Sequence, residues 1–255
     1  MLILVPPSEG KTAPLSGPVL DVDALLAPEL AELRSLIADA LAAASSREDA
    51  LRVLGVGARV ADDVAAQREL WTLPCAPARQ VYMGVLYAAM DLDSADDATL
   101  ARADESVRIF SGLFGVLRPS DFIPAYRLSM GTTLPGLGNT STLWRRALKH
   151  LDWGAGELVV DARSSGYQVW NPADSADHVV VGAARYRNGK RQVVSHFAKH
   201  YRGILAGALF RTATPPRDAE ELAEFAGRIE DDVIVGVELD PPGKGPRKLT
   251  LITDN

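Results

Sequence analysis

The stretch from Ser111 to Gly131 restricts the fold of this chain more than any other part of the sequence. It reads SGLFGVLRPSDFIPAYRLSMG and follows an apolar run. Glycines at Gly112 and Gly115 permit backbone conformations or close contacts that a side chain would prevent. Pro119 and Pro124 fix the backbone torsion φ at two further points. We therefore expect a stiff loop that leaves a buried strand.

Two arginines, Arg118 and Arg127, lie on this loop. A guanidinium group is planar and permanently charged, so on a rigid backbone it can bind phosphate or carboxylate with little loss of entropy. The alternative is structural: both side chains hold the loop in place through buried carbonyl groups or through Asp121.

Composition restricts the class of protein. The chain has 255 residues, 47% of them hydrophobic, and a formal charge of −6, which argues against a uniformly basic nucleic-acid binder but allows a local basic face. Cys75 is the single cysteine, so a disulfide within the chain and a cysteine-rich metal site are excluded. The sequence shows no secretion leader and no apolar run of about twenty residues. We expect a cytoplasmic protein without a membrane partner.

Hydrophobic patterns predict a mixed α/β fold, in which helices surround a mixed central sheet, and a single domain over residues 1–255. The segment 80–91 is expected to begin as a strand and to continue as a helix. The other expected strands are 2–5, 107–110, 157–162, 179–187, 191–195, 232–238 and 248–252, and the other expected helices lie within 21–45, 94–105, 141–151, 195–210 and 219–229.

Lys11 follows the first expected strand, in the sequence Gly10-Lys11-Thr12. A phosphate-binding loop of the nucleotide-binding type needs another glycine five positions before Gly10, where this chain has Val5. The sequence does not specify such a loop. Lys11 is still a candidate binding residue, because ligands of α/β proteins bind at the ends of strands. The alternative is a solvated lysine.

A glycine turn, Gly55-Val56-Gly57, lies between two helical patterns within residues 47–70. This arrangement resembles a helix-hairpin-helix, in which the turn presents backbone amides to a DNA phosphate. Arg59 is the cation beside the turn, whereas Asp62 and Asp63 disfavour a polyanion. A helical hairpin without a ligand is the alternative interpretation.

Residues 178–217 contain eight lysines and arginines and no acidic residue. The dipeptide Asn188-Gly189 predicts a hairpin, which leads into a helix with Lys199 and Arg202 near its start. Cations at a helix start are unfavourable without an anion, so this cluster is a candidate anion site; a solvated basic face is the alternative. His196 and His200 have metal-ligand spacing, but the glutamate of the hydrolytic metal motif is absent, and no metal or other cofactor is expected.

The distinctive polar residues follow expected strands or begin expected helices, where one pocket could collect them. Lys199 and Tyr126 are the candidate catalytic groups, because neighbouring cations would lower the pKa of either and suit it to proton transfer. The candidate anion- or nucleic-acid-binding residues are Lys11, Arg118, Arg127, Ser164, Lys199 and Arg202.

Several segments together resemble the YaaA family of bacterial proteins associated with resistance to peroxide stress. The most specific similarity is at Ser111–Pro119 and Tyr126–Gly131, followed by the Ala-Lys-x-x-Arg-Gly spacing that begins at Ala198, and by VYMG at 81–84. The similarity near Lys11 is looser, because this chain has Pro-Pro-Ser-Glu-Gly where the family often has a shorter Ser-Pro-Ala.

This resemblance implies a mixed α/β fold with a helix-hairpin-helix element, a cytoplasmic location, DNA binding, and protection from oxidative damage linked to intracellular iron. The residues themselves leave two further interpretations open. The chain could instead be an enzyme or sensor that acts on a phosphorylated or nucleotide-like small molecule in a cationic pocket, or its arginines could be structural and the protein could act by contacting a partner. No peroxide chemistry is evident at Cys75, which has no activating base in the sequence pattern.

Overall fold

The computed structural model describes residues 1–187, 190–193, 198–229 and 234–253. Within them, the main sheet has a parallel core and antiparallel edges, with the strand order β11-β12-β9-β8-β1-β3-β4, and β10 pairs with the far end of β9. Its strands are β1 (Leu2–Val5), β3 (Val107–Ser111), β4 (Gly115–Leu117), β8 (Leu158–Asp161), β9 (Asp177–Arg187), β10 (Lys190–Val193), β11 (Ile234–Leu239) and β12 (Arg247–Thr253). The expected mixed sheet is confirmed.

Four short strands form two small ladders outside this sheet: β2 (Ala76–Pro77) with β5 (Phe122–Ile123), and β6 (Thr133–Leu134) with β7 (Gly138–Asn139). The α-helices are α1 (Ala31–Ser45), α2 (Ala50–Leu54), α3 (Ala61–Ala66), α4 (Ala78–Val81), α5 (Val85–Met90), α6 (Asp97–Ser106), α7 (Thr140–Leu148), α8 (Ala198–Arg211) and α9 (Ala219–Gly227). Short 3-10 helices occupy Pro28–Leu30, Ala58–Val60, Gln67–Glu69, Leu92–Ser94 and Ser165–Tyr167.

One expected strand is wrong. Residues 78–81 form the helical turn α4, and Tyr82 is extended but makes only an isolated bridge to Lys11. The apolar and β-branched residues that suggested a strand are buried here without a ladder, because tertiary packing overrides a weak local preference. Ser195 and His196 fall outside the described residues, as do Asn188 and Gly189, although the pairing of Lys190 with Arg187 confirms the hairpin.

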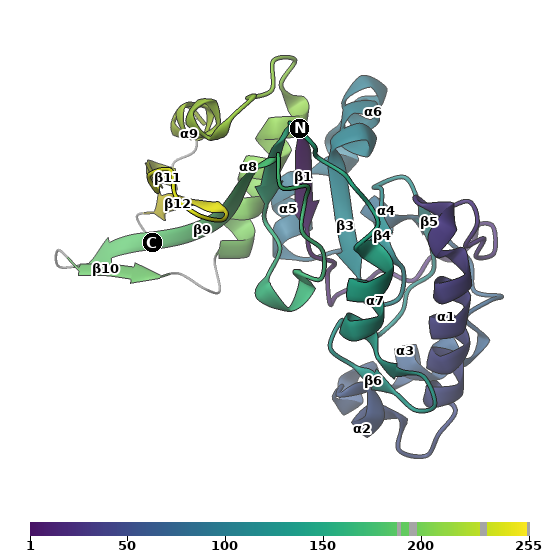
Figure 1. The fold of residues 1–255 in the computed structure, drawn as a ribbon. Helices are drawn as coiled ribbons and strands as arrows, with labels where there is room; N and C mark the ends of the chain where they lie inside the picture. Colours follow the sequence, from purple (N-terminus) through teal and green to yellow (C-terminus); the bar gives the residue numbers. More distant parts are fainter. Residues whose placement is uncertain (188–189, 194–197, 230–233, 254–255) are drawn as a thin grey trace.

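Different helices and strands lie on the two sides of the structure (Figure 1). Helices α1, α2 and α3 gather with β6 on one side of the sheet's β3–β4 edge, whereas β9, β10, β11, β12 and α9 lie on the other. Between them β1 is buried along its whole length, since Ile3, Leu4 and Val5 are inaccessible to solvent. One hydrophobic core includes residues from both sides.

The carboxyl ends of four adjacent strands meet at one edge of the sheet. β1 is parallel to β3 and to β8, and β8 is parallel to β9. The segments that begin at Pro6, Gly112 and Ala162 therefore leave the sheet in the same direction. In open α/β sheets ligands bind at this edge, and the candidate site described next is formed by these segments.

Candidate functional site

Lys11 lies beyond the carboxyl end of β1 on a segment with a fixed backbone. Its backbone bridges to Tyr82, and the amide of Thr12 donates to the carbonyl of Val81 at 2.9 Å. The Nζ atom donates to the carbonyl of Ser8 at 2.6 Å and lies 4.3 Å from the centroid of the Tyr126 ring. The side chain is therefore held over an aromatic surface and is mostly buried, which differs from a solvated lysine.

This environment changes the acidity of Lys11. Burial lowers its pKa from 10.5 to about 7, and the positive charge of Arg127 adds to that effect, while Glu9 and Asp63 oppose it. Removing an ammonium group from water disfavours its charged form. Near neutral pH a substantial fraction of Lys11 is consequently a neutral amine, which can act as a nucleophile or accept a proton.

Tyr126 is buried beneath Lys11. Its hydroxyl lies 2.8 Å from that of Tyr82 and 2.7 Å from Oγ of Ser111, so the polar groups satisfy each other. Burial raises the pKa of Tyr126 well above 10, opposite to the direction expected from the sequence. Tyr126 stays protonated and supports Lys11 through its ring.

The glycine turn faces the same region. Gly55 ends α2 in the left-handed conformation (φ +65°), and Gly57 precedes the 3-10 helix that leads into α3. The amide of Val56 caps α2 by donating to the carbonyl of Leu51 at 3.0 Å. Helices α2 and α3 lie on either side of Gly55-Val56-Gly57 in the sequence, and Arg59 is exposed beside the turn.

The turn and Lys11 line one cavity of about 290 Å³. Its wall comes from the segment after β1, the glycine turn, the loop after β5 and the 3-10 helix that follows β8. The lining residues are Ser8, Glu9, Lys11, Gly55, Val56, Gly57, Val60, Arg127, Leu128, Ser129 and Tyr167. Three groups singled out in the sequence, namely Lys11, the glycine turn and Arg127, thus meet in one place. The structure adds Glu9 and Tyr167, which no sequence pattern distinguishes.

Arg127 connects the parts of this wall. Its Nη2 and Nε lie 2.8 and 3.0 Å from Oδ2 of Asp63 in α3, and its Nη1 donates to the carbonyl of Glu9. Its backbone amide donates to Oε1 of Gln67 at 2.8 Å. Arg127 therefore has a structural role at the cavity, and Asp63 neutralises much of its charge.

The remaining predicted anion-binding residues do not line this cavity. The Nε of Arg118 lies 3.4 Å from Oδ1 of Asp121, as in the structural alternative. Arg118 follows β4, which runs antiparallel to β3, so it lies towards the opposite edge of the sheet. Arg202 donates to the carbonyl of Val181 at 2.9 Å, between α8 and β9. Arg127 and Lys199 line two different cavities, and neither of these cavities is lined by Arg118 or Arg202.

Ser164 precedes the short helix that carries Tyr167. The carbonyl of Ser164 accepts a hydrogen bond from the Tyr167 amide at 2.9 Å. The neighbouring Arg163 is buried and forms a bidentate pair with Asp161, at 2.7 and 2.9 Å. These contacts shape the turn after β8, so Ser164 positions a cavity residue without lining the cavity.

Lys199, at the start of α8, lines an adjoining cavity of about 440 Å³. This second cavity shares Ser8 and Glu9 with the first, so the two lie on either side of that segment. The remainder of its wall is mostly apolar and includes Pro6, Pro7, Gly84, Val85, Leu86 and Tyr87.

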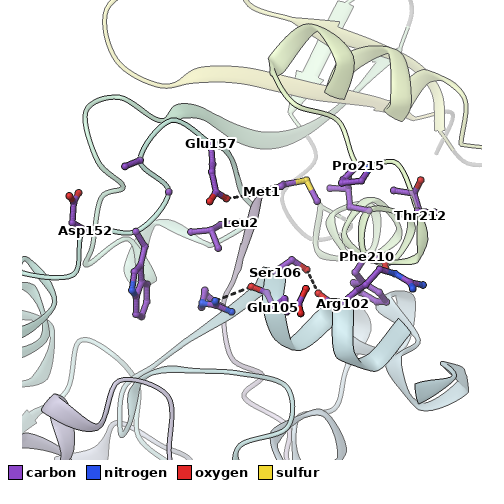
Figure 2. Close-up of a pocket in the computed structure, with 16 residues that line it drawn as sticks. Met1, Leu2, Arg102, Glu105, Ser106, Asp152, Glu157, Phe210, Thr212 and Pro215 are labelled. Carbon is purple, nitrogen blue, oxygen red and sulfur yellow. Dashed lines mark hydrogen bonds and ion pairs between the residues drawn. The ribbon is translucent and has the colours of Figure 1, made fainter. Parts of the chain in front are cut away.

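A third cavity, of about 600 Å³, lies at the amino end of β1 (Figure 2). Two of its charged groups are engaged locally: Glu157 pairs with the Met1 amino group at 2.6 Å, and Nε of Arg102 donates to the carbonyl of Phe210 at 3.1 Å. The cavity contains none of the residues that the sequence predicts for binding, and it lies opposite the edge where parallel strands present ligand-binding loops.

Metal and thiol chemistry have little support in the described residues. No cluster of three or more histidine, cysteine or acidic side chains is suitably placed there to bind a metal ion. Cys75 is buried, and burial raises the pKa of its thiol to about 11. The thiolate is the reactive form of cysteine, and burial disfavours that form of Cys75. Among these residues no helix has the length and apolar character required to span a bilayer.

Residues 1–230 match the sequence profile of a family described as Peroxide stress protein YaaA. A UPF0246 protein of Streptomyces coelicolor is 39% identical over 256 residues, which covers 98% of this chain and 97% of that protein. A UPF0246 protein of Corynebacterium efficiens is 43% identical over 230 residues, or 89% of this chain and 90% of its own length. A third UPF0246 protein, from Corynebacterium glutamicum, is 37% identical over 239 residues.

Proposed function

This chain belongs to the family of peroxide stress protein YaaA, and on that premise we propose that it acts in the cytoplasm by binding DNA during peroxide stress. The observation that carries the proposal is the cavity at the carboxyl edge of the sheet, where the Gly55–Gly57 turn faces Lys11. In the cell, the expected consequence is less of the damage that intracellular iron causes in the presence of peroxide.

Gly57 supports a ligand at the turn. Its φ of −83° and ψ of 167° are accessible to any residue. A Cβ added to Gly57 would meet no atom within 4 Å. Neither backbone conformation nor crowding therefore requires glycine at this position. Absence of a side chain would instead allow a phosphate backbone to approach the turn closely.

The charges near the turn predict modest, salt-dependent binding. Arg59 is exposed and supplies a cation, and Lys11 supplies a second one that is only partly protonated at neutral pH. Asp62 is exposed, and Asp63 offsets Arg127. With one to two phosphates neutralised, the logarithm of affinity should fall with the logarithm of salt at a shallow slope, on the order of −1 to −2.

Fluorescence anisotropy with labelled duplex DNA at several salt concentrations tests this proposal. Gly57→Val should weaken binding by about tenfold, since a branched side chain would hold the backbone away, and should unfold at the same temperature as the wild type. The matched control is Gly131→Val, at another glycine where an added Cβ meets nothing. Equal affinity of both variants, or no binding at low salt, would contradict the proposal.

Charge reversal gives an independent check. Arg59→Glu should weaken binding severalfold and reduce the salt slope by about 1. Arg228→Glu serves as the control, because Arg228 directly follows α9 on the opposite side of the molecule (Figure 1). If both reversals weaken binding equally, the turn is not the DNA contact.

A second function has support from the cavity itself. The cavity volume of about 290 Å³ is near the lower limit for small-molecule sites. A lysine with a pKa of about 7 suits an enzyme or sensor that acts on a phosphorylated or nucleotide-like molecule. Isothermal titration with a nucleoside monophosphate distinguishes this function. The small-molecule function would be favoured over DNA binding if the wild type binds the nucleotide, Lys11→Gln does not, and the wild type shows no affinity for duplex DNA.

A further inference from the structure

Lys11 has the surroundings of a lysine nucleophile. Its backbone is fixed by the bridge to Tyr82, its Nζ rests on the Tyr126 ring at 4.3 Å, and that atom also lies 5.4 Å from the Tyr82 ring centroid. None of the ion pairs in the described part of the chain includes Lys11. The amine therefore has one hydrogen-bond partner, the carbonyl of Ser8, and no carboxylate in direct contact among the described residues.

The charged groups around this amine have opposing effects. Burial and Arg127 lower the pKa of Lys11, whereas Glu9 and Asp63 raise it, and the balance is a pKa of about 7. Arg127 is itself paired with Asp63 and with the Glu9 carbonyl. A neutral amine is the nucleophilic form of lysine, and desolvation is the usual means by which proteins produce it.

We propose that Lys11 forms an imine with the aldehyde of a phosphorylated deoxyribose, the sugar that remains where DNA has lost a base. The inference rests on the proposed function and extends it by naming the substrate class, a DNA strand with an abasic site. The neutral Nζ adds to the aldehyde carbon to give a carbinolamine. Loss of the carbonyl oxygen as water then leaves a carbon–nitrogen double bond, and hydrolysis returns both partners.

The cavity fits this substrate better than it fits an intact nucleotide in a duplex. An abasic sugar has no base, so a space of about 290 Å³ can hold it. Its aldehyde is two carbons from a phosphate-bearing carbon, and the Gly55–Gly57 turn, where DNA phosphate is proposed to bind, lines the same cavity as Lys11. A nucleotide without a base also flips out of the DNA duplex at a smaller energetic cost than a paired nucleotide does.

Borohydride trapping tests the inference on the full-length protein. Reduction converts the imine to a stable amine, so a duplex with one abasic site should become covalently linked to the wild type, and peptide mass spectrometry should locate the link at Lys11. Lys11→Gln should lose at least 90% of the adduct, while Lys149→Ala, at an exposed lysine that follows α7, should retain it. A duplex with a tetrahydrofuran analogue, which has no aldehyde, should give none.

Three further measurements separate the outcomes. Trapping should increase about tenfold between pH 6 and pH 8, whereas a solvated lysine would react little below pH 9.

Anisotropy with intact duplex reports the proposed function independently: duplex binding without an adduct at Lys11 overturns the inference alone, and absence of duplex binding overturns the proposed function. Free 2-deoxyribose 5-phosphate is the third probe. An adduct at Lys11 with this sugar but not with abasic DNA would overturn the DNA substrate.

Discussion

Two tyrosine rings and a carbonyl group surround the amine of Lys11 where most buried lysines have an acidic partner. The rings offer a weak attraction for the cation and exclude water, so the charged form is only partly compensated. Tyr126, in contrast, has its hydroxyl satisfied by Tyr82 and Ser111. The lysine is thus the group in this pair that changes its protonation state near neutral pH.

The incomplete compensation of the Lys11 charge predicts that the stability of the protein depends on pH. The folded-state pKa of Lys11 is about 7, below the ordinary value of 10.5, so above pH 7 the unfolded chain binds more protons and folding becomes more favourable as pH rises towards 10.5. Below pH 7 both states are protonated and the full penalty of burying the charge remains. Lys11→Met removes this dependence.

Urea denaturation of both proteins at pH 6.5 and pH 8.5 measures the effect. The stability of the wild type relative to Lys11→Met should increase by at most about 2 kcal/mol over this range, since one pKa unit corresponds to about 1.4 kcal/mol. A difference that stays constant with pH would show that Lys11 is fully solvated in the folded protein.

Among the elements, α3 owes its attachment to side chains from other parts of the chain. It has only six residues, too few to be stable alone. The ion pair between Asp63 and Arg127 and the burial of Val64 attach it to the loop after β5. The same ion pair that positions the glycine turn therefore reduces the positive charge available to a ligand.

Helices α5 and α8 approach each other closely because of a glycine. A Cβ added to Gly203 would lie 2.4 Å from the carbonyl oxygen of Leu86 and 2.7 Å from the Cβ of Ala89. Since one obstacle is backbone, the helices would have to separate. Gly203→Ala should therefore destabilise the protein by about 2–3 kcal/mol in spite of its better helix propensity.

Gly227→Ala is the matched control for this prediction. Gly227 is also helical, at the end of α9, and an added Cβ there meets no atom within 4 Å. Thermal denaturation should show a lower midpoint for Gly203→Ala and little change for Gly227→Ala. Similar midpoints for the two variants would mean that α5 and α8 are not in close contact.

At the scale of the whole molecule, Arg34 joins α1 to distant segments. It is inaccessible to solvent and donates to the carbonyls of Phe114 and Val116 around β4. It also donates to those of Val22, Leu26 and Ala27 before α1. A single buried guanidinium thus donates to five backbone carbonyls from two segments that are far apart in the sequence.

Replacing this arginine should affect global stability. Arg34→Met keeps much of the apolar volume but removes five hydrogen bonds to backbone carbonyls, of which those of Phe114 and Ala27 keep a backbone donor. A buried carbonyl that loses its partner costs about 1–3 kcal/mol, so we expect a loss of about 3 kcal/mol. Arg145→Met, at an exposed position of α7, should change stability by less than about 0.5 kcal/mol. Urea denaturation compares the two, and equal effects would exclude the anchoring role of Arg34.

Much of the fold could be predicted from local pattern. The strands at 2–5 and 107–111, the helix at 31–45 and the hairpin joining β9 to β10 follow from apolar periodicity and turn residues, which act over short distances. The strand expected at the start of segment 80–91 is wrong, because burial by neighbouring elements decides the conformation there and the local preference does not. The burial of Arg34 could not be predicted, since a sequence pattern does not distinguish a buried arginine from an exposed one.

By itself, the sequence determined the mixed α/β class, the family resemblance and the glycine turn, because each depends on residues close together in the chain. Only the tertiary structure decided which charges meet. Parallel strand order brings Lys11 to the glycine turn and to Arg127, while the antiparallel β4 carries Arg118 away from them. Long-range pairing sets these neighbours, and desolvation, which changes the pKa of Lys11, exists only once the chain has folded around it.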